Sequence, residues 1–287
     1  MSNLKEIRNR IASVSSTMQI TSAMKMVSAA KLKKATDAIL QMRPYSNKLT
    51  ELIKNLNNSF EKMEDNPYAV IRSTNKTLII AITSNRGLCG AFNSSIIKVV
   101  KEIQNDKNEN DVSIMSIGKK GTDILSKGNN LNSSHDAIYD NLTHNTVSKI
   151  ADSIMLDFEN GKFDKVKIIY NRFKNAATQI VTIESFLPIV SNENQEEETA
   201  IIDYIFEPSK DEIMKNLLPK ALRIQLLKAL KDSLASEHGA RMTAMHKATD
   251  NAKELRDQLK LSYNKARQAS ITNEILEIVG GAEALKN

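Results

Sequence analysis

The segment best placed to do chemistry in this sequence is a short turn that contains two glycines. Gly87-Leu-Cys-Gly90 follows an apolar run and precedes a helical pattern, which is where phosphate-binding turns occur. However, the turn lacks the Gly-x-Gly-x-x-Gly spacing of dinucleotide sites, and no Gly-Lys-Ser/Thr follows it. The spacing therefore favours a tight strand-to-helix turn over a nucleotide site.

The single cysteine and the four histidines complete no catalytic or metal-binding pattern. Cys89 has no obvious histidine partner in the sequence, which favours a buried, inert thiol. His238 and His246 are eight residues apart on one helix, too far to share a metal ion. His135 and His144 add no His-x-x-x-His or Cys-x-x-Cys spacing. We expect no metal ion, no cofactor and no catalytic residue.

Composition and charge limit the class of protein. The 287-residue chain is 41% apolar and 26% charged, which is typical of a globular protein. Its net charge is +6, with +6 on residues 1–43, +4 on residues 220–287 and −4 on the middle. Basic ends suggest nucleic acid, but no zinc-finger, basic-zipper or aromatic RNA-binding signature is present. A coiled-coil adaptor or nucleic-acid-binding protein with an α/β head is one alternative, and a doubly wound enzyme is another.

No segment resembles a membrane span or a secretion signal. Apolar runs such as Leu78–Ile82 are far shorter than the roughly 18 residues that cross a bilayer. The first residues carry charges where a signal peptide needs an apolar core. A single cysteine forms no internal disulfide, which fits a reducing cytoplasm.

Both ends of the chain predict amphipathic helices, because their apolar residues recur at steps of three and four. The expected N-terminal seam is Leu4, Ile7, Ile11, Val14 and Met18, then Ile20, Met24, Val27 and Ala30. The expected C-terminal seam is Leu227, Leu230, Leu234, Met245, Ala248, Ala252, Leu255, Leu259, Tyr263 and Ala266.

The expected helices are too long for a compact globule. Residues 220–279 would span about 90 Å as a helix, whereas a compact chain of this size is about 50 Å across. The narrow seams indicate an antiparallel coiled coil that projects from the body. Gly239, inside the second helix, predicts either local weakness or close packing.

The middle of the chain predicts an α/β domain, because strand and helix patterns alternate. The expected strands are 77–83, 111–117, 165–172, 178–186 and 200–206, the last two forming an antiparallel edge, and the expected helices are 92–103, 122–126 and 146–158. The expected fold class is thus α/β plus a long antiparallel coiled coil formed by the N- and C-terminal helices. Its expected parts are a shaft helix at 1–60, a Rossmann-like foot at 70–207 and a second shaft helix at 209–287.

Three stretches resemble the gamma subunits of F-type ATP synthases, in the same order along the whole chain. The first is Ile7-Arg-Asn-Arg-Ile11 with the segment Met18–Lys31, and the second is Ser84–Asn93. The third and most specific is Ser236–Met245 with Tyr263–Thr272 and Glu277–Ala282. Asn85 stands where the family commonly has Asp, and Gly239 where it commonly has Ala or Ser.

The resemblance implies a role as the central rotor stalk of the proton-translocating F-type ATP synthase. Such a subunit transmits torque between the membrane c-ring and the catalytic ring of three alpha and three beta subunits, beside the epsilon subunit. It implies no catalytic residue, no cofactor, no nucleic acid and no transmembrane segment in this chain. The implied location is the cytoplasmic side of a bacterial inner membrane, as a peripheral protein.

The resemblance also implies which residues contact the beta subunit. Met24 and Lys25 would lie at the contact with its acidic lever segment, and the basic shaft helices would face that segment. The full implied set is Met24, Lys25, Glu237, Arg241, Arg267, Gln268, Thr272 and Glu274. The apolar end of the second helix, around Ile271–Val279, would lie in an apolar bearing.

Overall fold

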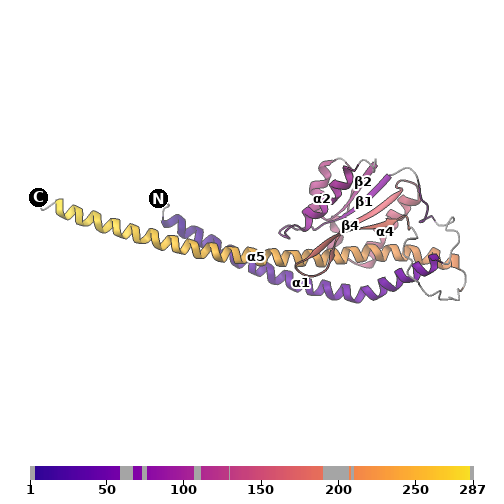
Figure 1. The fold of residues 1–287 in the computed structure, drawn as a ribbon, viewed down its shortest axis with the longest axis horizontal. Helices are drawn as coiled ribbons and strands as arrows, with labels where there is room; N and C mark the ends of the chain where they lie inside the picture. Colours follow the sequence, from indigo (N-terminus) through magenta and orange to yellow (C-terminus); the bar gives the residue numbers. More distant parts are fainter. Residues whose placement is uncertain are drawn as a thin grey trace. The chain divides into compact units, whose positions relative to one another are not determined.

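The computed structural model describes residues 4–58, 67–72, 76–106, 111–128, 130–189, 207 and 210–284. The chain divides into two compact units, one made of Met1–Ser28 with Met242–Asn287 and the other of Ala29–Arg241. The division passes through the two longest helices, α1 (Leu4–Asn58) and α5 (Lys210–Ala284) (Figure 1). The predicted strand at 200–206 lies outside the described residues.

The larger unit is built on a five-stranded sheet with the order β3-β2-β1-β4-β5 (Figure 1). Its strands are β1 (Lys76–Ile82), β2 (Asp111–Ile117), β3 (Leu131–Ser134), β4 (Lys165–Phe173) and β5 (Gln179–Leu187). All neighbours pair in parallel except β4 and β5, which are antiparallel. The expected α/β fold is therefore confirmed, with an antiparallel pair formed by β4 and β5; the expected edge of 178–186 with 200–206 involves residues outside the described ranges.

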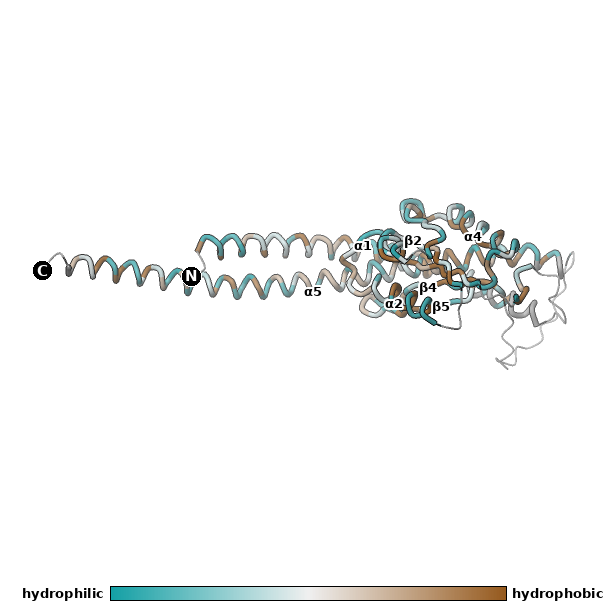
Figure 2. The backbone as a smooth tube through the Cα atoms, turned by 90° about the horizontal axis from the view of Figure 1, so that it is seen from above, coloured by the Kyte–Doolittle hydropathy of each residue, from teal (hydrophilic) through white to brown (hydrophobic). Residues whose placement is uncertain are grey.

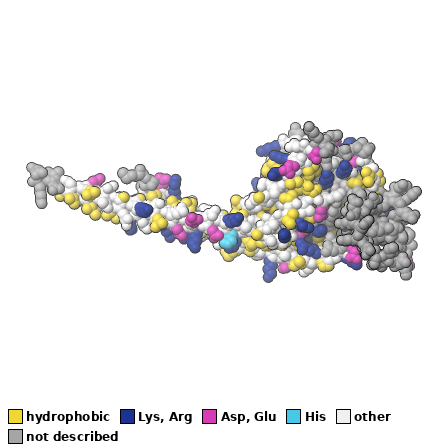
Figure 3. Space-filling model, viewed as in Figure 1, with side chains coloured by type: hydrophobic (Ala, Val, Ile, Leu, Met, Phe, Trp, Pro, Cys, Tyr) yellow, Lys and Arg dark blue, Asp and Glu magenta, His cyan; other side chains and the backbone are white. Residues whose placement is uncertain are grey.

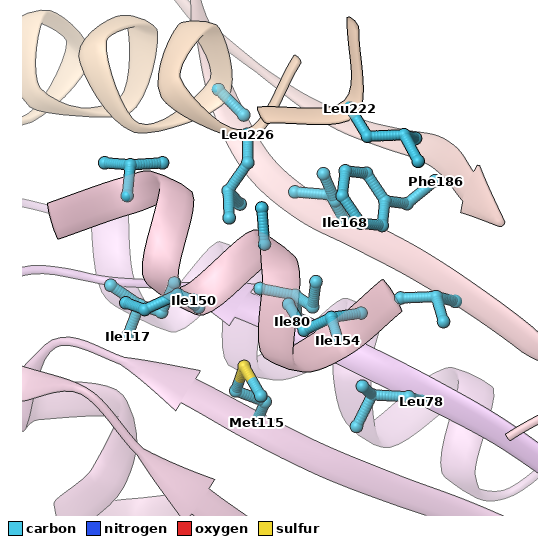
Figure 4. Close-up of a cluster of buried hydrophobic side chains, with 14 of the residues drawn as sticks. Leu78, Ile80, Met115, Ile117, Ile150, Ile154, Ile168, Phe186, Leu222 and Leu226 are labelled. Carbon is cyan, nitrogen blue, oxygen red and sulfur yellow. The ribbon is translucent and has the colours of Figure 1, made fainter. Parts of the chain in front are cut away.

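Strand β1 is buried on both faces because helices cover the two sides of the sheet. Leu78 and Ile80 point into one core and Ile79 and Ala81 into the other, as expected when side chains alternate along a strand. The first core is closed by α4 (His144–Glu159) and by α5, and the second by α2 (Phe92–Gln104) and α3 (Lys119–Leu125). Figure 4 shows the first core, with labelled side chains Leu78, Ile80, Met115, Ile117, Ile150, Ile154, Ile168, Phe186, Leu222 and Leu226.

One strand, β3, was not predicted from the sequence. Strand β3, whose sequence is Leu131-Asn-Ser-Ser134, pairs with β2 at the edge of the sheet and has alternately exposed residues. Its polar composition gives none of the apolar alternation that indicates a strand. Two short 3₁₀ segments, η1 (Ser126–Gly128) and η2 (Asp136–Asp140), complete this side of the unit.

The smaller unit is an antiparallel pair of helical segments from α1 and α5. Arg8 donates a 2.8 Å hydrogen bond to the hydroxyl of Tyr263, and the hydroxyls of Thr21 and Thr249 lie 2.8 Å apart. The later residue on α1, Thr21, contacts the earlier residue on α5, Thr249, so the two segments run in opposite directions. This confirms the expected antiparallel coiled coil.

The seam between these segments differs from the expected one after Met18. Ile20 and Val27 are 59% and 56% exposed, whereas Thr21 and Ser28 are buried. The three-four spacing simply continues, and it brings small polar residues into the seam and places the apolar ones outside.

In the C-terminal segment, too, an apolar residue of the expected seam is exposed and a polar neighbour contacts the other helix. Leu255 is 47% exposed, while the guanidinium Nη1 of Arg256 lies 3.7 Å from the sulfur of Met18. The buried hydroxyls are satisfied locally, since Thr21 donates to the carbonyl of Met18 and Thr249 donates to the carbonyl of Met245.

Candidate functional site

The α5 turn at residues 237–241, here called the anchor turn, carries a buried ion pair. Glu237 Oε1 lies 2.7 Å from Arg241 Nη1, and the two side chains are only 9% and 10% exposed. Burial raises the pKa of the Glu237 carboxyl, while Arg241 and, more weakly, Lys31 and Arg86 lower it. The four-residue spacing places both groups on one face of the helix.

Arg241 also binds the turn that follows strand β1. Its Nη2 donates to the carbonyl of Arg86 at 2.7 Å and to that of Gly87 at 3.3 Å, and its Nε donates to Gly87 at 3.3 Å. Guanidinium offers several donors in a fixed plane, which suits two adjacent carbonyls. The anchor turn is thus attached to the β1–α2 turn by charge-assisted hydrogen bonds.

The β1–α2 turn is shaped by its own polar contacts. The amide N–H of Ser84 donates to Asn93 Oδ1 at 2.9 Å, and the Ser84 hydroxyl donates to the carbonyl of Arg86 at 2.8 Å. Leu88 and Gly90 adopt positive φ angles of 61° and 60°, which reverse the chain before α2. Such local bonds hold the carbonyls of residues 86 and 87 where Arg241 can reach them.

Cys89 supports the same attachment by packing. It forms a small buried cluster with Phe92 and with Ala240 of the anchor turn, and burial raises the pKa of its thiol. A raised thiol pKa keeps the group protonated and unreactive near neutral pH. The expectation that Cys89 is buried is confirmed.

Gly239 attaches the anchor turn to a second loop. A Cβ atom at this position would lie 3.2 Å from both the Cα and the carbonyl oxygen of Ala176, in the turn between β4 and β5. Of the two alternatives, local weakness or close packing, the structure therefore supports close packing. The residues of the anchor turn thus contact two separate turns at the edge of the sheet.

The residues that follow strand β1 pack closely on the residues that follow strand β2. A Cβ atom on Gly118 would overlap the carbonyl oxygen of Thr83, and one on Gly121 would lie 2.6 Å from the hydroxyl oxygen of Thr83. Asn85 donates to the carbonyl of Asp136 at 2.8 Å and accepts from the amide of Lys119 at 2.9 Å. These contacts hold the start of the β1–α2 turn against the chain segments that follow β2 and β3, whereas the Arg86 side chain is exposed.

The other residues implied by the resemblance lie in the smaller unit. Met24 and Lys25 are half-buried on α1. Arg267 and Gln268 are exposed on α5, and the exposed Thr272 donates to the carbonyl of Gln268 at 2.9 Å. Glu274, also exposed, accepts a hydrogen bond from Ser270 at 3.3 Å.

Of the eight implied contact residues, the structure places only Glu237 and Arg241 in direct side-chain contact. Sequence reasoning missed the backbone partners of Arg241, which are the carbonyls of Arg86 and Gly87. The available signal was the four-residue spacing of two opposite charges on a helix face that is otherwise small and apolar. That spacing indicates an ion pair but does not indicate which carbonyls the arginine reaches.

The C-terminal end of α5 has an apolar surface. Figures 1 and 2 show this end continuing past the point where α1 begins. Figure 3 shows hydrophobic side chains along its surface. The large apolar residues exposed there are Ile271, Ile275, Leu276, Ile278 and Val279.

The described residues contain neither a helix that could span a membrane nor a cluster of metal ligands. No helix among them is both long and apolar enough to cross a membrane. Within the same ranges, no group of three or more His, Cys, Asp or Glu side chains is arranged to hold a metal ion.

Comparison with known proteins identifies the family. Residues 3–285 match a family model described as ATP synthase. The ATP synthase gamma chain of Flavobacterium johnsoniae is 62% identical over 285 residues, 99% of each chain. That of Flavobacterium psychrophilum is 60% identical over 286 residues, 100% of each chain.

Solved structures are similar as well. A chain of the central stalk and c-ring of the mitochondrial ATP synthase of Tetrahymena thermophila has a TM-score of 0.61 and 28% identity, covering 80% of this chain and 99% of that one. A chain from the Euglena gracilis mitochondrial ATP synthase has a TM-score of 0.70 and 22% identity, covering 98% and 94%. The second likeness bears on the fold alone. Because the family model and the curated relatives span almost the whole sequence, the chain belongs to the ATP synthase gamma chain family.

Proposed function

We propose that this chain is the central rotor stalk of a proton-translocating F-type ATP synthase. It transmits torque between the membrane c-ring and the ring of alpha and beta subunits during ATP synthesis or hydrolysis. The observation that carries the proposal is the 62% identity to a gamma chain over 99% of both sequences. Catalysis belongs to other subunits of the complex. The match favours this role over a coiled-coil adaptor or nucleic-acid-binding protein.

Torque transmission needs a firm joint between the sheet and the helix that turns with it. The anchor turn supplies it, because Arg241 holds the carbonyls of Arg86 and Gly87 while Gly239 packs on Ala176. Buried charge-assisted bonds have defined lengths and directions, so they resist sliding better than apolar contact alone. In this account the foot is residues 70–207, and the shaft is residues 1–60 and 209–287.

Contact with the beta subunit is the second requirement. Met24 and Lys25 would meet the acidic lever segment of beta. Arg267 and Gln268 would contact a beta loop, with Thr272 and Glu274 supporting them. Exposed charges of this kind attract at long range yet contribute only about 0–1 kcal/mol per pair, so the surface can slip without sticking.

Glu237 and Arg241 act differently in this proposal. Their side chains are almost fully buried against their own chain. We therefore assign them to the beta contact indirectly, through the position of the β1–α2 turn that Arg241 holds.

The remaining partners follow from the rotor role. The apolar end of α5, with Ile275 and Val279 exposed, would rotate in an apolar bearing inside the alpha–beta ring. The foot would rest on the epsilon subunit and the c-ring. The complex would place this chain on the cytoplasmic side of a bacterial inner membrane as a peripheral subunit.

Replacement of the gamma chain in the Flavobacterium johnsoniae enzyme tests the proposal. Membrane vesicles that carry this chain in place of the native gamma chain should regain ATP-driven proton pumping. Vesicles without any gamma chain are the control. Failure of this chain to assemble with the alpha and beta subunits, or assembly without proton pumping, would contradict the rotor role.

A further inference from the structure

A cavity of about 580 Å³ lies within the larger unit, beside the anchor turn. Besides α5, three parts of the chain line the cavity: α1, the β1–α2 turn, and the residues at the end of η2 and just after it. The lining residues on α5 include Lys231, Glu237 and His238. This volume is in the range of small-molecule sites, which is about 300–1,000 Å³.

The charges that line the cavity are unbalanced. Four cationic side chains contribute to it, Lys31 and Lys34 from α1, Arg86 from the β1–α2 turn and Lys231 from α5. The acidic lining residues are Asp140 and Glu237, and the Glu237 carboxylate is already paired with Arg241. Among the described residues, none of the four cations has a carboxylate within 4.0 Å.

His238 adds a polar atom that the chain leaves unsatisfied. Its Nδ1 is buried, lines this unit's interior beside the cavity and has no hydrogen-bond partner in the described part of the chain. Burial, with Arg241 and Lys31 nearby, lowers the pKa of His238 to about 4, so the ring is neutral at pH 7. In a neutral imidazole one ring nitrogen donates and the other accepts, and a buried polar atom of either kind without a partner is unfavourable by about 1–3 kcal/mol.

We propose that this cavity binds a multiply charged phosphate anion, such as pyrophosphate or the phosphate groups of a nucleotide. Lys31 and Lys34 would supply ammonium groups, and Arg86 would supply a planar guanidinium, which pairs well with phosphate oxygens. A single compact anion can satisfy cations that converge from three elements, whereas an acidic peptide spreads its charges along a backbone. The bound anion would link α1, the β1–α2 turn and α5.

This site is separate from the close packing of Thr83 against Gly118 and Gly121, and it does not depend on the proposed rotor role. The cations belong to helix faces and to one turn, not to a glycine-rich cradle. A ligand that binds only the folded unit stabilises that unit by an amount that grows with the logarithm of the ligand concentration.

Titration calorimetry on the purified full-length chain tests the proposal. Pyrophosphate should bind at one site and more tightly than inorganic phosphate, because it carries more charge. Arg86→Gln and Lys34→Gln should each weaken pyrophosphate binding by about tenfold. Lys33→Gln is the matched control, because it removes the same charge from an exposed neighbour that does not line the cavity, and it should change binding by less than about twofold.

Four results would overturn the proposal. One is the absence of saturable pyrophosphate binding, and another is an equal loss in Lys33→Gln, which would mean that only net charge matters. The third is tighter binding of a glutamate-rich peptide than of pyrophosphate, which would make the cavity a peptide site. Comparison of ADP, adenosine and pyrophosphate then separates the two phosphate sources: tighter ADP binding indicates a nucleotide, and tighter pyrophosphate binding indicates free phosphate. Binding of adenosine as tight as that of ADP would contradict a phosphate site.

Discussion

Gly239 of α5 lies against the backbone of Ala176, so closely that a Cβ atom at position 239 would stand 3.2 Å from both the Cα and the carbonyl oxygen of Ala176. Backbone atoms cannot move aside as the end of a flexible side chain can. Gly239→Val should therefore lower the free energy of unfolding by about 1–3 kcal/mol through crowding. Urea denaturation measures this change.

Gly280→Val is the control for this substitution. It lies on the same helix, and no atom comes within 4 Å of a Cβ built there. Its effect should stay within about 0.5 kcal/mol, as for other open surface positions. Equal effects of the two substitutions would mean that Gly239 does not mark a close contact.

The Glu237–Arg241 pair predicts a strong non-additive effect. Arg241→Met leaves the buried Glu237 carboxylate without its partner and should cost about 3–5 kcal/mol of unfolding free energy. The double variant Glu237→Gln with Arg241→Met removes both charges and should be more stable than the sum of the single effects implies. Denaturation of all four proteins measures the coupling, and simple additivity would contradict a buried, interacting pair.

His238 predicts a loss of stability in mild acid. Its pKa is about 4 in the folded chain against an ordinary value of 6.5, so the unfolded chain takes up a proton first as the pH falls. The stability that a neutral His238 contributes is present above pH 6.5 and is lost progressively between pH 6.5 and pH 4. Denaturant midpoints at pH 7 and pH 5 measure the loss.

His238→Gln should flatten that pH dependence, because Gln does not titrate. A steep dependence that persists in His238→Gln would assign the acid sensitivity to other groups.

The exposed apolar end of α5 predicts a difference between the free chain and the complex. Ile275→Ser with Val279→Ser should change the unfolding free energy of the free chain by less than about 1 kcal/mol, because both side chains are already exposed. The same pair should weaken assembly with the alpha and beta subunits if this surface rests in an apolar bearing. Gel filtration of the mixed subunits measures assembly, and unchanged assembly would argue against the bearing.

The sequence predicted most of the architecture because its strongest signals are local. The apolar run of β1 and the three-four spacing of the long helices needed no knowledge of distant contacts. The seam of the smaller unit was predicted less well, because polar residues such as Thr21 occupy it and Ile20 does not. Sequence reasoning assigns the nearest apolar residue to the seam. Which face of the helix is actually buried depends on the helix that pairs with it.

The attachment of α5 to the sheet could not be predicted in the same way. Arg241 reaches the carbonyl of Arg86 across 155 residues, and a backbone carbonyl has no signature in the sequence. Likewise, Gly239 indicated a special position without naming Ala176 as its neighbour. Contacts of this kind depend on the completed fold.

Rotation of the assembled complex tests the central claim most directly. A bead can be attached through Ser94→Cys, which is exposed on α2, while the native Cys89 is buried and should not react. With the alpha and beta subunits fixed to a surface, addition of ATP should turn the bead in one direction in successive steps. A bead that stays still while the same complexes hydrolyse ATP would contradict the role of this chain as the rotor.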